Sequence, residues 1–347
     1  MLKDFRASVK ETSLPVVLYG TGDAAERLLS LLENIGVRCC GCFASSGFVR
    51  NRTFHGYKVL SYEDARRIWG RMAVVMGFGT HEEDTIRDIK EIAEENEFYC
   101  PCLLTDENGR PFDADYYNSR IDDFTYFRNL LTDERSREIY DAVIAFRITG
   151  DIGYILPVGE DEMTSWRNLT FGDDESFVDI GAYNGDTVLR FISLTHGRYR
   201  EITAFEPDPR SFRKAEKRLE GIPHLTLSDV PLSSCVEKVF FEEGNGRGNR
   251  RSSSGEERET TTLDIALRGK TPTILKFDAE GDEEKILEGG RGIISSFKPK
   301  LILSVYHRID DFFRLAGKLL SLNSGYTKFT LRTARAIPDW DIILIVE

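Results

Sequence analysis

The chain has 347 residues, enough for two domains of ordinary size, and its hydrophobic content of 41% is that of a globular protein. It carries 46 basic and 58 acidic residues, which gives a formal net charge of −12. Nucleic-acid binding requires a basic surface that neutralises phosphates, so this balance argues against DNA or RNA as a partner.

The first six residues contain no apolar core, so we expect no secretory signal. No apolar run approaches the ~20 residues that a membrane-spanning helix needs. We therefore expect a cytoplasmic protein without a membrane span.

The six cysteines allow two interpretations, a metal site or buried free thiols. Structural zinc sites usually pair two C-x-x-C units, and neighbouring residues of a strand point to opposite faces. Free, mostly buried thiols therefore fit the spacing better, and we predict no metal ligands among them. The cysteines are Cys39, Cys40, Cys42, Cys100, Cys102 and Cys235.

An α/β pattern occupies the first hundred residues. Val16–Tyr19 predicts a strand, Gly20-Thr21-Gly22 a tight turn, and the following apolar stripe a helix that ends at Gly36. Further strands are predicted over residues 37–43 and 73–76. The pattern resembles a small Rossmann-like domain.

The glycine turn at residues 20–22 suits phosphate binding at a helix N-terminus, but the second strand ends without the acid that holds an NAD ribose. Ser45 and Ser46 with Arg50 or Arg52 offer an alternative, the 2′-phosphate of NADP. A nucleotide-sugar is another candidate ligand. A scaffold or a homo-oligomer contact is the plainer interpretation.

Residues 107–166 change in character, because charged helical stretches dominate. Tyr140, Val143, Ile144 and Phe146 form an amphipathic stripe. This segment is either a plain linker or a wall of a substrate pocket.

The most informative stretch is Phe177–Thr187, in which a buried strand carries Asp179 and leads through Gly181 and Gly185 into a helix. Such an order predicts a tight turn whose amides face a ligand. A second strand, residues 202–205, closes on Glu206. A carboxylate at that place grips a ribose diol in nucleotide-binding folds.

Two later segments complete the pattern. Lys276-Phe277-Asp278-Ala279-Glu280-Gly281 follows a predicted strand, and residues 303–308 read Leu-Ser-Val-Tyr-His-Arg. With the first stretch, D-x-G-x-x-x-G, they resemble the S-adenosylmethionine-dependent methyltransferases, and among these the FkbM family. The resemblance covers roughly the C-terminal half of the chain.

The resemblance implies two doubly wound, Rossmann-like domains joined by a helical segment. The C-terminal one would have the class I methyltransferase fold with an antiparallel C-terminal hairpin, here residues 326–332 and 342–346. We expect domain limits at 1–106, 107–166 and 167–347. Residues 244–262 are low in complexity and predict either a surface hairpin or a lid over the substrate.

The cofactor site implied by the resemblance is an S-adenosylmethionine site at the strand ends. Asp229, after a predicted third strand, would touch adenosine in this superfamily, although a turn role is equally open. Asp278 would face both the sulfonium and the acceptor. The expected cofactor-binding residues are Asp179, Gly181, Asn184, Gly185, Asp186, Thr187, Glu206, Asp229 and Asp278.

Methyl transfer to a hydroxyl needs alignment and a base. His307 is our first choice for that base, because its unperturbed pKa lies near ~6.5. Asp278 or Glu280 is the alternative. The three together could also hold Mg²⁺, which we do not favour.

The predicted function is therefore O-methylation of a hydroxyl on a sugar, a glycan precursor or a secondary metabolite. The acceptor would be a small molecule or a glycan. The competing hypothesis is a nucleotide-sugar or NADP-binding protein whose methyltransferase-like half is inactive.

Overall fold

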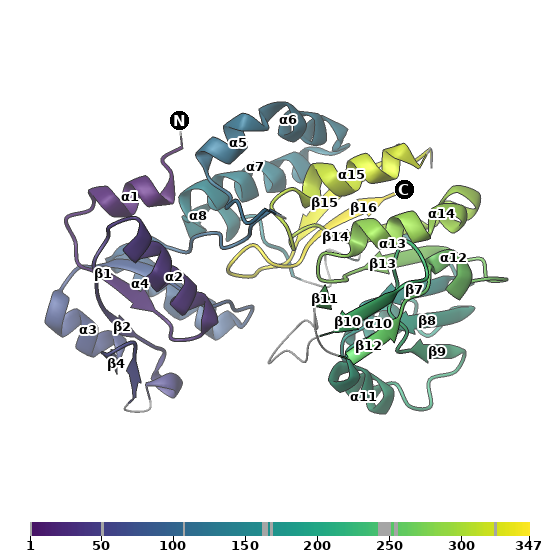
Figure 1. The fold of residues 1–347 in the computed structure, drawn as a ribbon, viewed down its shortest axis with the longest axis horizontal. Coiled ribbons are helices and arrows are strands. Elements are labelled where there is room, and N and C mark those ends of the chain that lie inside the picture. The colour runs from purple at the N-terminus through teal and green to yellow at the C-terminus, as the bar shows by residue number, and fades with distance from the viewer. Residues whose placement is uncertain are drawn as a thin grey trace. The chain divides into compact units, whose positions relative to one another are not determined.

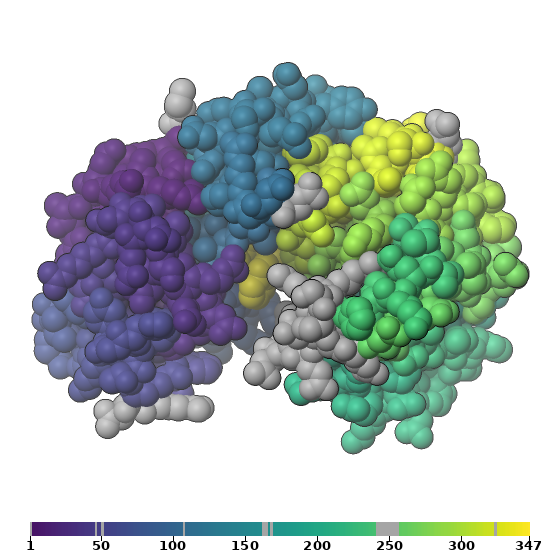
Figure 2. All heavy atoms as spheres, in the orientation of Figure 1, coloured from purple at the N-terminus to yellow at the C-terminus, as the bar shows by residue number. Residues whose placement is uncertain are grey.

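The computed structural model describes residues 2–49, 52–106, 108–161, 166, 169–241, 251–252, 256–322 and 325–347 (Figure 1). The chain divides into two compact units. Unit 1 comprises residues 1–124, 137–161 and 333–341, and unit 2 comprises residues 125–136, 162–332 and 342–347. Side chains fill the space between the ribbons within each unit (Figure 2).

Unit 1 is built on a six-stranded sheet with the order β3-β4-β2-β1-β5-β6. All neighbours pair in parallel except β3 and β4. Its strands are β1 Val16–Tyr19, β2 Cys39–Phe43, β3 Thr53–Phe54, β4 Tyr57–Leu60, β5 Ala73–Met76 and β6 Glu97–Tyr99.

An apolar helix face packs on this sheet. In α2, Leu28, Leu29 and Leu32 recur at helical spacing and are buried against β1 and β2. The helices are α1 Phe5–Glu11, α2 Asp23–Asn34, α3 Tyr62–Trp69, α4 Glu83–Glu95, α5 Ala114–Ser119 and α8 Ile152–Ile155. Helices α6 Ile121–Leu130 and α7 Glu134–Thr149 each contribute residues to both units.

A late segment of the chain, residues 333–341, belongs to unit 1. The amide of Thr80 donates to the carbonyl of Ile337 at 2.7 Å, and the amide of Ile337 donates back at 2.9 Å. Nε of Arg147 donates to Asp339 at 2.6 Å, and both of these side chains are buried. The segment is therefore an integral part of the N-terminal unit.

Unit 2 contains a seven-stranded sheet with the order β15-β16-β14-β13-β7-β8-β9. Strands β14, β13, β7, β8 and β9 pair in parallel, in this order, and β16 runs antiparallel to β14. These strands are β7 Ser176–Ile180, β8 Glu201–Phe205, β9 Leu225–Ser228, β13 Ile274–Phe277, β14 Lys300–Ser304, β15 Phe329–Thr333 and β16 Ile342–Val346.

The central strands β7, β13 and β14 are apolar and almost wholly buried, as expected for a parallel sheet that is covered on both faces. The other helices of unit 2 are α10 Asp186–Leu194, α11 Pro209–Arg218, α12 Leu263–Ala266, α13 Glu283–Gly289, α14 Arg291–Phe297 and α15 Asp311–Ser321. In α11, Pro209 occupies the first turn and Asp208 caps it by accepting from the amide of Ser211 at 2.7 Å.

A small second sheet in unit 2 consists of β10 Lys238–Phe241, β11 Arg251–Ser252 and β12 Glu256–Glu259, with β10 in the centre. Strand β10 pairs antiparallel with both neighbours. Residues 242–243, and residues 244–250 and 253–255 of the low-complexity stretch, lie outside the described residues.

The fold class predicted from the sequence is confirmed: both units are α/β structures with largely parallel sheets, and the second ends in an antiparallel hairpin. The domain limits at residues 106 and 166 remain predictions. No helix in the described part of the chain is long and apolar enough to cross a membrane.

Candidate functional site

Five parallel strands of unit 2, namely β14, β13, β7, β8 and β9, bring the predicted site residues together at their carboxyl ends. Strand β7 lies between β13 and β8, so the chain order reverses at this point. Asp179 pairs in register with Lys276 on one side and with Ala204 on the other. Glu206 follows Ala204 by two positions and so falls on the same face as Asp179. Open α/β sheets bind ligands at such a reversal.

Gly181 makes the turn after β7, and no other residue fits there. Its φ is +81°, and a Cβ at this position would lie 1.8 Å from the carbonyl oxygen of Asp278. The amides of Gly181 and Ala182 both donate to the carbonyl of Phe205 at 2.9 Å. The turn therefore holds the ends of β7, β8 and β13 together.

Glu206 is buried and faces this turn. Its Oε2 accepts from the amide of Tyr183 at 2.7 Å and its Oε1 from the amide of Asp208 at 2.8 Å. Burial raises the pKa of Glu206 to about 7, although both hydrogen bonds act in the opposite direction. The carboxylate is thus close to its titration point at neutral pH.

Lys276 is a buried cation at the centre of the site. Its Nζ lies 3.1 Å from Oδ1 of Asp179 and 3.5 Å from Oδ2 of Asp278, and it donates to the carbonyl of Gly181 at 2.9 Å. The side chain of Asp179 is 0% exposed, and its Oδ2 has no hydrogen-bond partner in the described part of the chain. Burial raises the pKa of Asp179 to about 6 against the pull of Lys276.

Asp278 and His307 meet at the tips of β13 and β14. Nε2 of His307 lies 3.3 Å from Oδ1 of Asp278, and the hydroxyl of Tyr306 donates to the same oxygen at 3.3 Å. Burial alone would raise the pKa of Asp278, but Lys276 and His307 outweigh it and hold that pKa well below its usual range. Asp278 is therefore an ionised carboxylate.

Glu280, the third proposed catalytic residue, follows Asp278 by two positions. It is exposed and has a left-handed backbone with φ of 53°. The structure thus brings together two of the three proposed catalytic residues, Asp278 and His307.

The remaining residues of the motif form the start of α10. Asn184 accepts through Oδ1 from the amide of Asp186 at 3.1 Å and from Arg218 at 2.7 Å. Gly185 is the N-cap with φ of 82°, and a Cβ there would meet Leu219 at 2.8 Å. Thr187 donates its amide to Asp186 at 2.8 Å. This loop is fixed largely by its own polar groups.

Asp229 follows β9 and is 57% exposed at its side chain, where Arg258 binds it at 2.8 Å. Arg258 also donates to the carbonyls of Pro207 and Asp229, at 2.6 Å each. It thereby ties the ends of β8 and β9 together. Nothing in the sequence marks Arg258 as functional, because it lies in the polar strand β12 within the low-complexity stretch.

Glu283 is a second residue that the sequence analysis missed. It begins α13, its side chain is 0% exposed, and its Oε1 lies 2.9 Å from Nδ1 of His307. Asp278, Glu283 and His307 each offer one donor atom, all within 4.8 Å of one another, the spacing that a bound cation would need. In this structure the three side chains already pair with one another, because His307 contacts both carboxylates.

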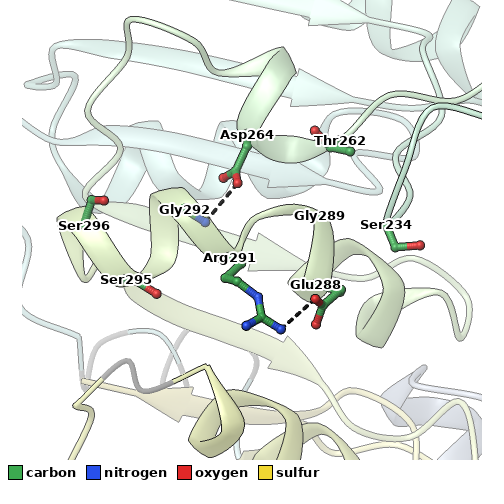
Figure 3. Close-up of a pocket in the computed structure, with 9 residues that line it drawn as sticks. All are labelled: Ser234, Thr262, Asp264, Glu288, Gly289, Arg291, Gly292, Ser295 and Ser296. Atoms are coloured by element: carbon green, nitrogen blue, oxygen red, sulfur yellow. Dashed lines mark hydrogen bonds and ion pairs between the residues drawn. The ribbon is translucent and has the colours of Figure 1, made fainter.

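A surface pocket of about 560 Å³ lies elsewhere in unit 2 (Figure 3). There Asp264 accepts from the amide of Gly292 at 2.9 Å, and Arg291 binds Glu288 at 2.7 Å (Figure 3). Asp264 also accepts from the amide of Ile293 at 2.9 Å. These contacts cap α14 and stabilise its first turn. The pocket contains none of the predicted site residues: it is lined by Ser234, Thr262, Asp264, Glu288, Gly289, Arg291, Gly292, Ser295 and Ser296.

Comparison with protein families decides the identity of the C-terminal unit. Residues 179–328 match the family described as the Methyltransferase FkbM domain. The chain therefore carries an FkbM methyltransferase domain. The matched range begins at Asp179 and includes Glu206, Asp278 and His307, so the FkbM domain contains the whole of the site described above.

Solved structures agree with this fold. A methyltransferase FkbM from Methylobacillus flagellatus aligns over 99% of this chain and 92% of its own, with a TM-score of 0.76 and 20% identity. At that identity the likeness shows the fold alone. No curated protein matches the chain.

Two further structures align with about half of the chain, at low TM-scores. A precorrin-6y C5,15-methyltransferase from Geobacter metallireducens covers 53% of this chain and 84% of its own, at 14% identity and a TM-score of 0.34. An rRNA methylase from Streptococcus thermophilus covers 50% and 87%, at 17% identity and 0.31.

The glycine turn of unit 1 lies outside the FkbM domain. Arg52 donates to the hydroxyl of Thr21 in this turn, and Ser45 exchanges a hydrogen bond with Tyr19 at 2.8 Å. Arg50 and the side chain of Ser46 lie outside the described residues. A phosphate ligand at this turn stays a hypothesis.

Proposed function

We propose that the protein transfers a methyl group from S-adenosylmethionine to a hydroxyl of a small molecule or glycan. The observation that carries the proposal is the pair of buried carboxylates, Asp179 and Glu206, on neighbouring parallel strands beside the Gly181 turn. The FkbM domain makes the protein a methyltransferase. That the methyl group goes to an oxygen atom is our proposal.

The strand tips have features that suit this cofactor. Asp179 has a buried oxygen without a hydrogen-bond partner in the described part of the chain. A Cβ at Gly181 would collide with the carbonyl oxygen of Asp278 and so keep the turn from approaching the tip of β13. We assign the ribose diol to Glu206, whose two oxygens each retain a lone pair for a hydroxyl donor. Residues of the motif loop would hold the rest: Gly181, Asn184, Gly185, Asp186 and Thr187.

S-adenosylmethionine, when bound, supplies a methyl group on a positively charged sulfur. The protein's own contribution is then mostly alignment, which is worth up to ~7–11 kcal/mol in favourable intramolecular reactions. A lone pair of the acceptor oxygen forms the new bond to carbon, and the electrons of the sulfur–carbon bond remain on sulfur. S-adenosylhomocysteine and one proton are the other products.

We propose that Asp278 accepts the proton of the acceptor hydroxyl and that His307 assists it. Both ring nitrogens of His307 already lie within hydrogen-bond distance of carboxylates, so Asp278 is the better placed of the proposed bases. As the oxygen–carbon bond forms, the acceptor oxygen becomes an oxonium whose proton is strongly acidic. A carboxylate with a low pKa can therefore accept it, and such proton transfer adds ~10²–10⁴-fold.

Calorimetry with S-adenosylhomocysteine tests the cofactor assignment. We expect binding by the wild-type protein, a sharp loss with Glu206→Ala, and nearly unchanged affinity with His307→Ala. If the wild-type protein does not bind, the proposal fails. Incubation with labelled S-adenosylmethionine and cell extract, followed by mass spectrometry, would identify the acceptor and its methylated atom.

A further inference from the structure

One buried carboxylate, that of Glu283, joins the two strand tips that carry Asp278 and His307. Its Oε1 accepts from the amide of Ala279 at 2.7 Å and lies 2.9 Å from Nδ1 of His307. Ala279 belongs to the turn after β13, and His307 follows β14. Glu283 thus fixes that turn and the imidazole ring with a single oxygen.

The opposite nitrogen of the ring, Nε2, lies 3.3 Å from Oδ1 of Asp278, and the His307 side chain is only 8% exposed. An ionised carboxylate can only accept a hydrogen bond, so a ring nitrogen that hydrogen-bonds to one carries a proton. A ring with two N–H groups is an imidazolium.

We propose that Glu283 is a positioning residue that holds His307 as an imidazolium, whose Nε2–H fixes Asp278 for the transfer. This inference deepens the methyltransferase function proposed above and rests on it. The imidazolium also stabilises the negative charge of Asp278 before that carboxylate takes up the proton.

The charged surroundings support this state of the ring. Burial lowers the pKa of His307, but Asp278 and Glu283 outweigh it and raise that pKa well above its ordinary value. In turn, His307 holds the pKa of Glu283 below its usual range, although burial acts in the opposite direction. Opposite charges at this distance each favour the charged form of the other.

Other charged groups approach the cluster from each neighbouring element. From β13, Lys276 pairs with Asp278 at 3.5 Å. From α15, buried Asp311 accepts from the amide of Arg308 at 2.7 Å and is bound by Arg314 at 2.6 Å. The guanidinium of Arg308 donates to the carbonyl of Gly281 at 3.1 Å. The acid on α15 is therefore held by Arg314, and His307 is left to Asp278 and Glu283.

Nitrogen NMR of the imidazole tests the charge state without any methyl acceptor. In protein labelled with ¹⁵N-histidine, comparison with His307→Gln identifies the His307 signal. We expect both of its nitrogens to be protonated at pH 7.5. The Glu283→Gln substitution removes the negative charge beside Nδ1 but keeps the shape of the side chain, so the ring of His307 should be neutral at that pH.

The matched control is Glu284→Gln, because Glu284 is the next residue and pairs with Arg314 instead, at 2.7 Å. Both variants should bind S-adenosylhomocysteine within about twofold of the wild type. Methyl incorporation into the extract should fall roughly 10–100-fold in Glu283→Gln only, as for loss of assistance to proton transfer.

A neutral His307 in the wild-type protein at pH 7.5 would overturn the inference, and so would equal rates in the two variants. If Glu283→Gln does not fold, the wild-type spectrum still decides the charge state. Failure of the parent proposal looks different, because the protein would then not bind S-adenosylhomocysteine whatever the charge of the ring.

Discussion

Lys276 places its ammonium 3.1 Å from Asp179, a carboxylate that is completely buried. Removing one partner of such a pair leaves an uncompensated charge in the interior, which costs more than the pair itself contributes.

We therefore expect Lys276→Met to lower the free energy of unfolding by about 3–5 kcal/mol. Urea denaturation at pH 7.5 measures this, and Lys238→Met is the control, because Lys238 pairs with Glu257 at the surface. The control should keep the wild-type midpoint. Adding Asp179→Asn to Lys276→Met should restore part of the loss, and a double variant no more stable than the single one would contradict the pairing.

Gly181→Ala should abolish binding of S-adenosylhomocysteine, because the new Cβ would lie 1.8 Å from the carbonyl oxygen of Asp278. Gly197→Ala separates this clash from backbone strain, since Gly197 has a similar φ of +73° with nothing within 4 Å of its Cβ position. The control should lose about 1–2 kcal/mol of stability and keep its affinity. Calorimetry and urea denaturation of both variants give the comparison, and equal affinities would exclude the tight approach.

Binding of S-adenosylhomocysteine should weaken as the pH falls below 7, because the pKa of Glu206 is raised to about 7 and the ionised carboxylate is the stronger acceptor. If only the ionised form binds, the affinity at pH 6 is about tenfold lower than at pH 8. Glu206→Gln should remove this dependence. A wild-type affinity that does not change over this range would count against the ribose contact.

The same shift has a consequence for stability. A carboxyl whose pKa is higher in the folded than in the unfolded protein binds more protons when folded, so its contribution is lost as the pH rises from ~4.3 to about 7. The unfolding free energy of Glu206→Gln should therefore fall less between pH 5 and pH 8 than that of the wild type. Parallel curves would show that Glu206 titrates normally.

Arg258→Ala should weaken S-adenosylhomocysteine binding roughly fivefold, the equivalent of ~1 kcal/mol, because the ends of β8 and β9 lose their shared donor. Arg200→Ala is the control, since Arg200 binds Asp174 and Thr271 before the start of β8. Calorimetry that finds the two variants equal would remove Arg258 from the cofactor site.

Chelation with EDTA should leave methyl transfer unchanged, because the ring of His307 already pairs with both Asp278 and Glu283. The measurement is the rate of labelled-methyl incorporation before and after dialysis against EDTA. Loss of activity that Mg²⁺ restores would show that a cation replaces the ring proton.

The sequence predicted the sheet and the strand tips because its signals there are local. Apolar runs that end at glycine or at an acid mark the strands, and Gly181 marks a turn that only glycine can make. The parallel order then follows from the helices between the strands. These features need no knowledge of distant contacts.

The partners of the site could not be predicted in this way. Glu283 stands among the acids Glu280, Asp282 and Glu284, and no periodicity tells which of them turns inward. Arg258 lies in the polar strand Glu256-Glu257-Arg258-Glu259, which has no apolar pattern to mark it. Both act through contacts with residues more than 20 positions away, His307 and Asp229.

The return of residues 333–341 to unit 1 bears on how the protein is made. Trp340 covers Gly79 so closely that an added Cβ would lie 1.9 Å from its ring, and Asp339 supplies the buried partner of Arg147. A ribosome must therefore synthesise residues 162–332 of unit 2 before unit 1 can acquire residues 333–341. Expression of residues 1–166 alone would yield a fragment that lacks both contacts.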